Sequence, residues 1–215
     1  MIIQIFEVYS HEEARALADL GVDHVGVLVG SKGFDVGVSP KCAASILSGL
    51  PSSCKGVVLT LSSNLAEILE LVNFAKPRIL QLQALPNQDL PATMRAVKKA
   101  HPYLQITRAV PVVNDSSIDY AKTYEGVADF LLLDTVSDQF GATGQAHNWD
   151  ISARIVKGVA IPAILAGGLG PDNVVEAVKR VRPFGVDSKT RTDTANGLGK
   201  DLEKVRQFVE QARSS

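Results

Sequence analysis

The stretch Ala163-Ile164-Leu165-Ala166-Gly167-Gly168-Leu169-Gly170-Pro171-Asp172 decides the fold. It opens with a short, continuously apolar run, which is typical of a strand covered on both faces of a parallel sheet. Its glycine pair permits a tight turn, and Pro171 then opens an amphipathic segment that reaches about Val181. A buried strand followed by a turn and a helix is one βα unit, so this stretch predicts a parallel α/β fold.

The same unit recurs along the whole chain, because short β-branched or aliphatic runs alternate with amphipathic segments. An N-cap at Ser10 and the Ser39-Pro40 pair are typical helix starts. Eight consecutive units predict a closed (β/α)8 TIM barrel that forms a single domain over residues 1–215. A doubly wound open sheet is the alternative, but it usually needs fewer units, and the first strand lacks a Gly-x-Gly-x-x-Gly turn. The expected strands are Ile2–Phe6, His24–Val29, Gly56–Thr60, Ile79–Gln83, Gln105–Val110, Phe130–Asp134, Ala163–Ala166 and Gly185–Ser188.

Composition excludes several classes of protein. The net charge is −1 over 215 residues, so no broad basic face is expected and nucleic acid is a poor partner. No apolar stretch has the length of a membrane span, and the start of the chain has no basic leader. Cys42 and Cys54 lack the spacing of zinc ligands and the density of a disulfide scaffold. We therefore expect a cytoplasmic protein without metal, cofactor or membrane partner; a homo-oligomer is compatible with the sequence.

The carboxyl ends of barrel strands carry the active site, and this rule selects the candidate phosphate ligands. Gly167 and Gly168 end the seventh strand, where exposed backbone amides suit an anion. Lys189, Thr190 and Arg191 follow the eighth strand, and their side chains suit phosphate oxygens. The alternatives are a tight turn at the glycines and a solvated loop at the charged residues. The site as a whole predicts a small phosphorylated metabolite as ligand.

Asp134 ends the apolar sixth strand and is the candidate general acid or base, with a helix cap as the alternative role. The loop that follows contains Gly144, and it either closes over substrate or simply connects two elements. His147 is interpreted as a structural or surface residue. Four other strand-end side chains are candidates for contact with substrate: Glu7, Gln81, Gln83 and Arg108.

Several of these motifs together resemble the phosphoribosylanthranilate isomerase family of tryptophan biosynthesis. Leu131–Thr135 is similar to the family's strand ending in its general-acid aspartate. Gly141–Gly144 with Asn148-Trp149 resembles its Gly-Gly-Thr-Gly loop and the Asp-Trp after it. Leu165–Leu169 is similar to its phosphate-binding turn, and Arg182–Asp187 to its Arg-Pro-Tyr-Gly-Val-Asp strand.

The first half of the chain departs from that pattern. The family begins with Lys-Ile-Cys-Gly, whose cysteine is the general base, whereas Gln4-Ile5-Phe6-Glu7 stands here. Phe6 thus occupies the place of the cysteine, and Glu7 is the nearest substitute base. Gln81–Ala84 stands where Gln-Leu-His-Gly is usual, and Ser188–Arg191 replaces a Val-Ser-Ser-Gly phosphate loop.

The resemblance implies an intramolecular isomerase that performs an Amadori rearrangement, from an aldose to a ketose, on a phosphorylated sugar amine. An acid opens the sugar ring and a base moves the neighbouring carbon-bound proton. Because the usual base is absent, two other functions stay open. One is a phosphosugar epimerase, aldolase or lyase, with Lys189 as a candidate for Schiff-base chemistry. The other is a non-catalytic paralogue that binds a phosphorylated metabolite.

Overall fold

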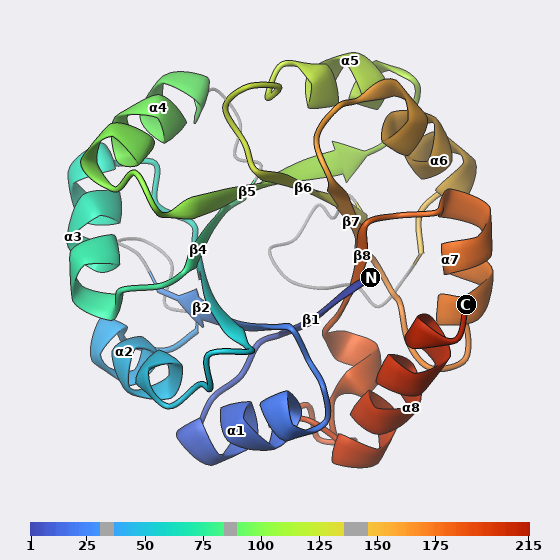
Figure 1. Cartoon of the computed structure of the whole chain (residues 1–215), viewed down its shortest axis with the longest axis horizontal. Helices are drawn as coiled ribbons and strands as arrows, with labels where there is room; N and C mark the ends of the chain where they lie inside the picture. The colour runs from blue at the N-terminus through green and yellow to red at the C-terminus, as the bar shows by residue number, and fades with distance from the viewer. Residues whose placement is uncertain (31–36, 84–89, 136–145) are drawn as a thin grey trace.

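The structure is a computed structural model that describes residues 1–30, 37–83, 90–135 and 146–215. Its parallel strands form a closed barrel in the order β1-β2-β3-β4-β5-β6-β7-β8, with helices around the outside (Figure 1). The predicted (β/α)8 barrel is thereby confirmed. The strands are β1 Ile2–Phe6, β2 His24–Val29, β3 Lys55–Thr60, β4 Ile79–Leu82, β5 Gln105–Val112, β6 Phe130–Thr135, β7 Ala163–Leu165 and β8 Gly185–Ser188. The helices are α1 His11–Asp19, α2 Pro40–Ser48, α3 Leu65–Ala75, α4 Leu90–Ala100, α5 Ser116–Lys122, α6 Trp149–Gly158, α7 Val174–Val181 and α8 Leu202–Arg213, with a short 3₁₀ turn η1 at Thr190–Thr192.

Side chains alternate between the two faces of the barrel wall, as the pleat requires. The outward set packs against the helices and forms the larger hydrophobic core. The inward set forms a smaller apolar cluster that fills the barrel, so the barrel is a packed core and not a pore. Its buried members are Phe6, Val57, Ile79, Phe130, Leu132, Ile164 and Ala166.

Local chemistry places most helix starts where the sequence predicts them. The Ser10 hydroxyl accepts from the Glu13 amide, and the Ser39 hydroxyl accepts from the Cys42 amide with Pro40 in the first turn. α7 differs, because it begins at Val174 and not at Pro171. The Asn173 side-chain amide explains why the helix starts later. It accepts from the Gly170 amide and donates to the Gly168 carbonyl, and these bonds hold residues 171–173 in a turn.

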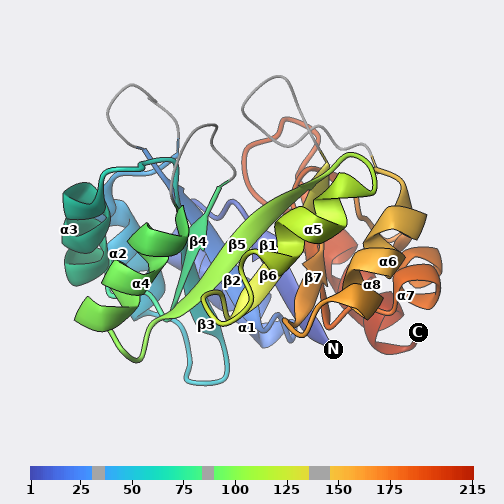
Figure 2. The same ribbon diagram turned by 90° about the horizontal axis from the view of Figure 1, so that it is seen from above.

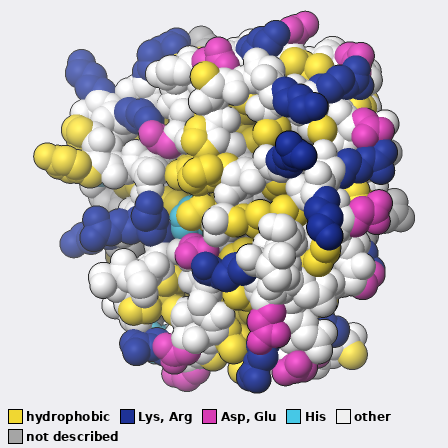
Figure 3. Space-filling model, turned by 45° about the vertical axis from the view of Figure 1, so that its right-hand side comes forward, with side chains coloured by type: hydrophobic (Ala, Val, Ile, Leu, Met, Phe, Trp, Pro, Cys, Tyr) yellow, Lys and Arg dark blue, Asp and Glu magenta, His cyan; other side chains and the backbone are white. Residues whose placement is uncertain are grey.

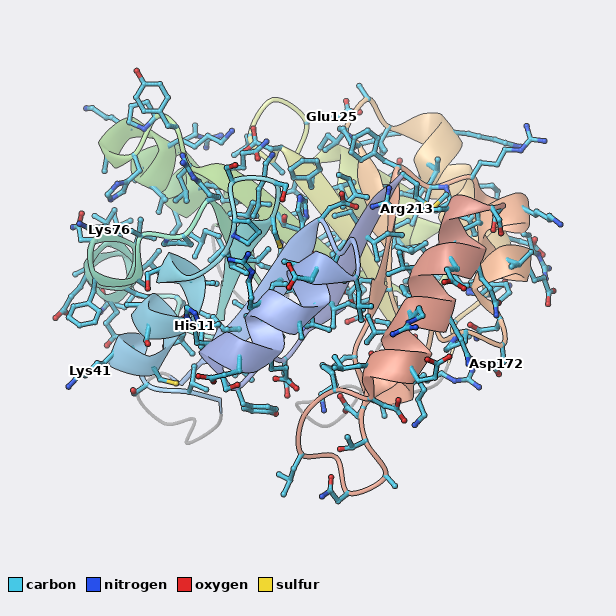
Figure 4. All side chains as sticks on the ribbon, turned by 60° about the horizontal axis from the view of Figure 1, so that its bottom comes forward. His11, Lys41, Lys76, Glu125, Asp172 and Arg213 are labelled. Carbon is cyan, nitrogen blue, oxygen red and sulfur yellow. The ribbon has the colours of Figure 1, made fainter. Side chains whose placement is uncertain are left out.

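The two ends of the barrel are built differently. Arg213 closes the amino-terminal end, since its guanidinium donates to the Gly21 carbonyl at 2.7 Å and to an Asp23 carboxylate oxygen at 3.2 Å. Figure 4 shows Arg213 and Glu125 toward this end, and Asp172 toward the opposite one. Figure 2 shows the barrel from the side, with α2, α3 and α4 at one side of the strands and α6, α7 and α8 at the other. Among the described helices, none is long and apolar enough to span a membrane.

Candidate active site

Two carboxylates face the barrel interior near its carboxyl end. The pairings Leu133↔Leu165 and Leu165↔Val186 set β6, β7 and β8 side by side. One residue further along each strand, Asp134 and Asp187 therefore flank Ala166, whose methyl group is buried in the barrel core. The alternation along each strand places both carboxylates on the inward face of the wall, with only a methyl group between them.

Burial alters the protonation of both carboxylates. Asp187 is 8% exposed, and desolvation first, then the charge of Asp134, raises its pKa to about 7. Desolvation likewise raises the pKa of Asp134, although the Thr135 amide donates to it at 2.8 Å and opposes the shift. Burial therefore favours the protonated form of both carboxyls, and a carboxyl whose pKa is raised in this way is suited to acid–base chemistry.

Below this pair lies a buried chain of polar side chains. The Gln4 amide nitrogen donates to Asp187 Oδ1 at 3.1 Å and lies 3.4 Å from Gln81 Oε1. The Gln4 oxygen lies 3.2 Å from His24 Nδ1. Burial, followed by the charge of Lys55, lowers the pKa of His24 to about 4, so this histidine is neutral. Gln81 was a predicted substrate contact, and the structure places it in this interior chain, 3% exposed.

The turn after β7 presents backbone amides at the open carboxyl end of the barrel, which we call the mouth. Gly167 and Gly168 have φ angles of +81° and +64°, which glycine adopts without strain. Their amides donate to no acceptor in the described part of the chain. A side chain at Gly167 would also place its Cβ 2.3 Å from Thr135 Oγ1. The turn thus offers unpartnered donors to an anion, in the way that phosphate sites do.

The loop after β8 holds its cations in ion pairs. Lys189 Nζ lies 3.6 Å from Glu7 Oε2 and 3.1 Å from Asp193 Oδ2. Burial opposes the charge on Lys189, but these two carboxylates outweigh it and raise the pKa of the ammonium. The Arg191 guanidinium donates to Asp172 at 2.5 Å and to the Gly168 carbonyl at 3.2 Å.

Of the remaining residues predicted to contact substrate, Gln83 has a position that is compatible with such a contact and Arg108 does not. The Gln83 side-chain oxygen is buried and has no hydrogen-bond partner in the described residues, so it is available to a ligand. Thr190 starts η1, beside Lys189. Gly144 lies outside the described residues.

The expectation that Arg108 contacts substrate is corrected by its position. β5 continues to Val112, so Arg108 lies inside the strand and not at its end. Its neighbour Thr107 takes the inward place, and Arg108 points outward, fully buried. Its guanidinium bonds the Leu82 carbonyl at 3.1 Å and lies 5.7 Å and 4.9 Å from the rings of Tyr120 and Tyr124. A buried cation held by a carbonyl and by aromatic faces stabilises the β5–α5 contact and points away from the barrel interior.

One residue of the site, Asp187, was missed by sequence reasoning. It follows the apolar Val186 within β8, and a carboxylate inside a buried strand was the signal that could have identified it. His147 was interpreted as structural, and its ring does bridge two elements: Nδ1 lies 3.2 Å from Thr135 Oγ1 and Nε2 lies 2.6 Å from Ser152 Oγ. Burial lowers the pKa of His147 to about 4, so the imidazole that forms this bridge is neutral.

Comparison with known proteins identifies the family. Residues 7–211 match the family described as N-(5'-phosphoribosyl)anthranilate (PRA) isomerase. The chain belongs to this family. N-(5'-phosphoribosyl)anthranilate isomerase of Methanocella arvoryzae is 36% identical, over 98% of this chain and 97% of the relative. N-(5'-phosphoribosyl)anthranilate isomerase 2 of Methanosarcina mazei is 34% identical, over 100% of this chain and 95% of the relative. Among solved structures, phosphoribosyl anthranilate isomerase from Thermotoga maritima superposes with a TM-score of 0.84 at 25% identity, covering all of both chains.

Within this PRA isomerase family member, no cysteine reaches the mouth. Phe6 is 5% exposed and its ring packs on Gly26, where a Cβ would lie 2.4 Å from the ring. Cys42 lies in α2. Cys54 directly precedes β3, at the amino-terminal end, where burial and then the charge of Asp23 raise the pKa of its thiol to about 12. Both positions agree with the expectation that neither thiol replaces the missing base.

The amino-terminal end of the barrel is the end opposite to the carboxylate pair and the glycine turn. A surface hollow of about 390 Å³ lies there, lined by Met1, Val178, Lys179, Arg182, Pro183 and Ser215. On the face drawn in Figure 3, Lys and Arg side chains are interspersed with acidic and hydrophobic ones. In the described residues, no three His, Cys, Asp or Glu side chains gather as metal ligands.

Proposed function

We propose that this protein is an intramolecular isomerase that converts N-(5'-phosphoribosyl)anthranilate to its ketose by an Amadori rearrangement. The observation that carries the proposal is the carboxylate pair Asp134 and Asp187 at the mouth of a PRA isomerase-family barrel. A protonated carboxyl at this place can open the sugar ring, and a carboxylate can remove the neighbouring carbon-bound proton. We assign the acid to Asp134.

The phosphate end of the substrate is proposed to bind at the turn after β7. The unpartnered amides of Gly167 and Gly168 are its donors, and the Thr190 side chain lies on the adjoining loop. Lys189 and Arg191 are already paired with Glu7, Asp193 and Asp172, so we assign them to shaping these loops and supplying positive charge nearby. Gln83 is proposed to contact the rest of the substrate.

Two other functions rest on weaker observations. A Schiff-base lyase or aldolase needs a neutral lysine, and the carboxylates around Lys189 favour its charged form. A non-catalytic binding protein is favoured by Phe6, since phenylalanine cannot accept a proton.

The test is turnover of N-(5'-phosphoribosyl)anthranilate by the purified full chain, together with rescue of a tryptophan auxotroph that lacks the isomerase. We expect conversion, and a loss of about 100-fold or more in kcat for Asp134→Asn, the usual contribution of a positioned acid. Binding of the substrate without conversion would overturn the isomerase and support the binding protein.

A further inference from the structure

Asp187 is a buried carboxylate that forms no ion pair with any residue that the structure describes. The side-chain partner it has in the described residues is the neutral amide of Gln4, at 3.1 Å. Lys200 is near enough to lower its pKa slightly, but the Lys200 ammonium donates to Asp193 Oδ1 and the Lys189 carbonyl. Burying an unpaired carboxylate is unfavourable for folding, and such groups are concentrated at functional sites.

The side chain of Asp187 also faces the space where the reaction would occur. Its strand pairs through Gln4↔Asp187 with β1, the strand that carries Phe6, and it flanks Ala166 opposite Asp134. Phe6 points into the same barrel interior two residues beyond Gln4. Asp187 is therefore next to the strand that lost the base and across a methyl group from the proposed acid.

Glu7 is the competing base, and its contacts are of another kind. One carboxylate oxygen, Oε2, accepts from the Tyr9 hydroxyl at 2.9 Å and pairs with Lys189 at 3.6 Å. These contacts hold Glu7 against the loop after β8. Oε2 of Glu7 is thus occupied by the Tyr9 hydroxyl and the Lys189 ammonium. Asp187 instead accepts from one neutral donor, Gln4, and has Asp134 as a carboxylate neighbour.

We propose that Asp187 is the general base of this site, in place of the cysteine that Phe6 has replaced. The inference rests on the proposed isomerase function.

Each proton in the proposed reaction has a donor and an acceptor. Asp134 gives its proton to the ring oxygen, the bond from that oxygen to C1 breaks, and C1 forms an iminium with the nitrogen. The Asp187 carboxylate then takes the proton from C2, the electrons of that C–H bond form the C1=C2 bond, and the π pair of the C1=N bond returns to nitrogen, which gives a neutral enaminol. Asp187 returns its proton to C1, and Asp134 recovers one from the C2 hydroxyl, leaving the ketone. Both carboxyls end in their starting states, and the net change is an isomerisation.

The groups around Asp187 suit a base. Burial raises its pKa most, Glu7 after β1 raises it as well, and Gln4 on β1 and Lys200 lower it. Asp134 on β6 carries no charge while it holds the proton for the ring oxygen; once it has given that proton up, its charge makes Asp187 a stronger base for the step at C2.

The experiment compares Asp187→Asn, Glu7→Gln and the double variant Phe6→Cys with Asp187→Asn, all in the full chain. Asparagine keeps the shape of Asp187 and can still accept from Gln4, so the fold should survive; thermal melting verifies it. We expect Asp187→Asn to lower kcat about 100-fold or more with KM changed less than about fivefold, and Glu7→Gln to lower kcat less than about tenfold. Adding Phe6→Cys should restore kcat at least about tenfold, because it returns a base to the family's position.

If Asp187 had only a structural role, the Phe6→Cys thiol on β1 would not restore the activity of Asp187→Asn. If the kcat of Asp187→Asn stayed within about fivefold of the parent, the inference would be overturned while the isomerase stayed intact. The same holds if Glu7→Gln lost activity and Asp187→Asn did not. A parent chain that binds but does not convert the substrate would overturn the proposed function itself, and the inference with it.

Discussion

At the scale of single residues, the carboxylate of Asp187 links catalysis to stability. Its folded-state pKa of about 7 lies well above the value of about 3.9 for a free aspartate. Between these two values the folded protein binds more protons than the unfolded chain. Stability attributable to Asp187 is therefore greatest at low pH and is lost as the pH rises from about 4 to about 7.

We expect Asp187→Asn to stabilise the protein above pH 7, because it removes a charge that the interior does not compensate. The gain in free energy of unfolding should approach about 4 kcal/mol at pH 8 and vanish near pH 4, where both side chains are neutral. Urea denaturation of the parent and the variant at several pH values measures this difference. Asp19→Asn is the control, since Asp19 is exposed on α1. A variant less stable than the parent at pH 8 would contradict the assigned burial of charge.

At the scale of elements, the β7–α7 turn depends on a backbone conformation that only glycine adopts easily. Gly167 combines a φ of +81° with a neighbouring Thr135 hydroxyl that leaves no room for a Cβ. Asn173 fixes the other side of the turn through Gly168 and Gly170. The anion site is thus a property of the turn and needs no charged side chain of its own.

We expect Gly167→Ala to destabilise the fold by about 1–3 kcal/mol and to weaken phosphate binding, because the turn must shift to relieve the clash. Thermal melting with and without inorganic phosphate measures both effects. Gly126→Ala is a matched control: its φ is +74°, but nothing lies within 4 Å of the added Cβ. It should lose stability from the backbone alone and keep the shift that phosphate produces. Equal phosphate shifts in Gly167→Ala and the parent would remove this turn from the binding site.

At the scale of the whole molecule, closure of the barrel joins the two ends of the chain. β1 pairs with β8 over Ile2↔Gly185 to Ile5↔Ser188, and Arg213 on α8 reaches Asp23 before β2. The outward core is one continuous cluster that includes residues from the first strand to the last helix. The first units therefore cannot bury their apolar faces without the last.

We expect residues 1–215 to unfold as one domain, in a single cooperative transition. Trp149, the only tryptophan, is buried at the start of α6 and reports on the second half of the barrel. Its fluorescence and the far-ultraviolet circular dichroism should change together in urea. Two separated transitions would contradict a single domain.

Local sequence signals were sufficient to predict the architecture and most strand bounds. Continuous apolar runs separated by helix caps at Ser10 and Ser39 are local signals, and they require only the propensities and spacing of neighbouring residues. The same local signals placed Asp134 and the glycine pair at strand ends. The resemblance to the family added the expectation that Phe6 stands where the family has its cysteine.

The tertiary structure was needed to show which face of the barrel each side chain takes and which groups it contacts there. A strand that is apolar on both faces carries no alternation to read, so Arg108 was expected at the mouth and instead lies against α5. The loop cations Lys189 and Arg191 turned out to be paired with carboxylates from other loops. Asp187 and Asp134 flank Ala166 because β6, β7 and β8 pair side by side in a register that aligns these three residues. Strand register and burial set that arrangement, and neither is written in the local sequence.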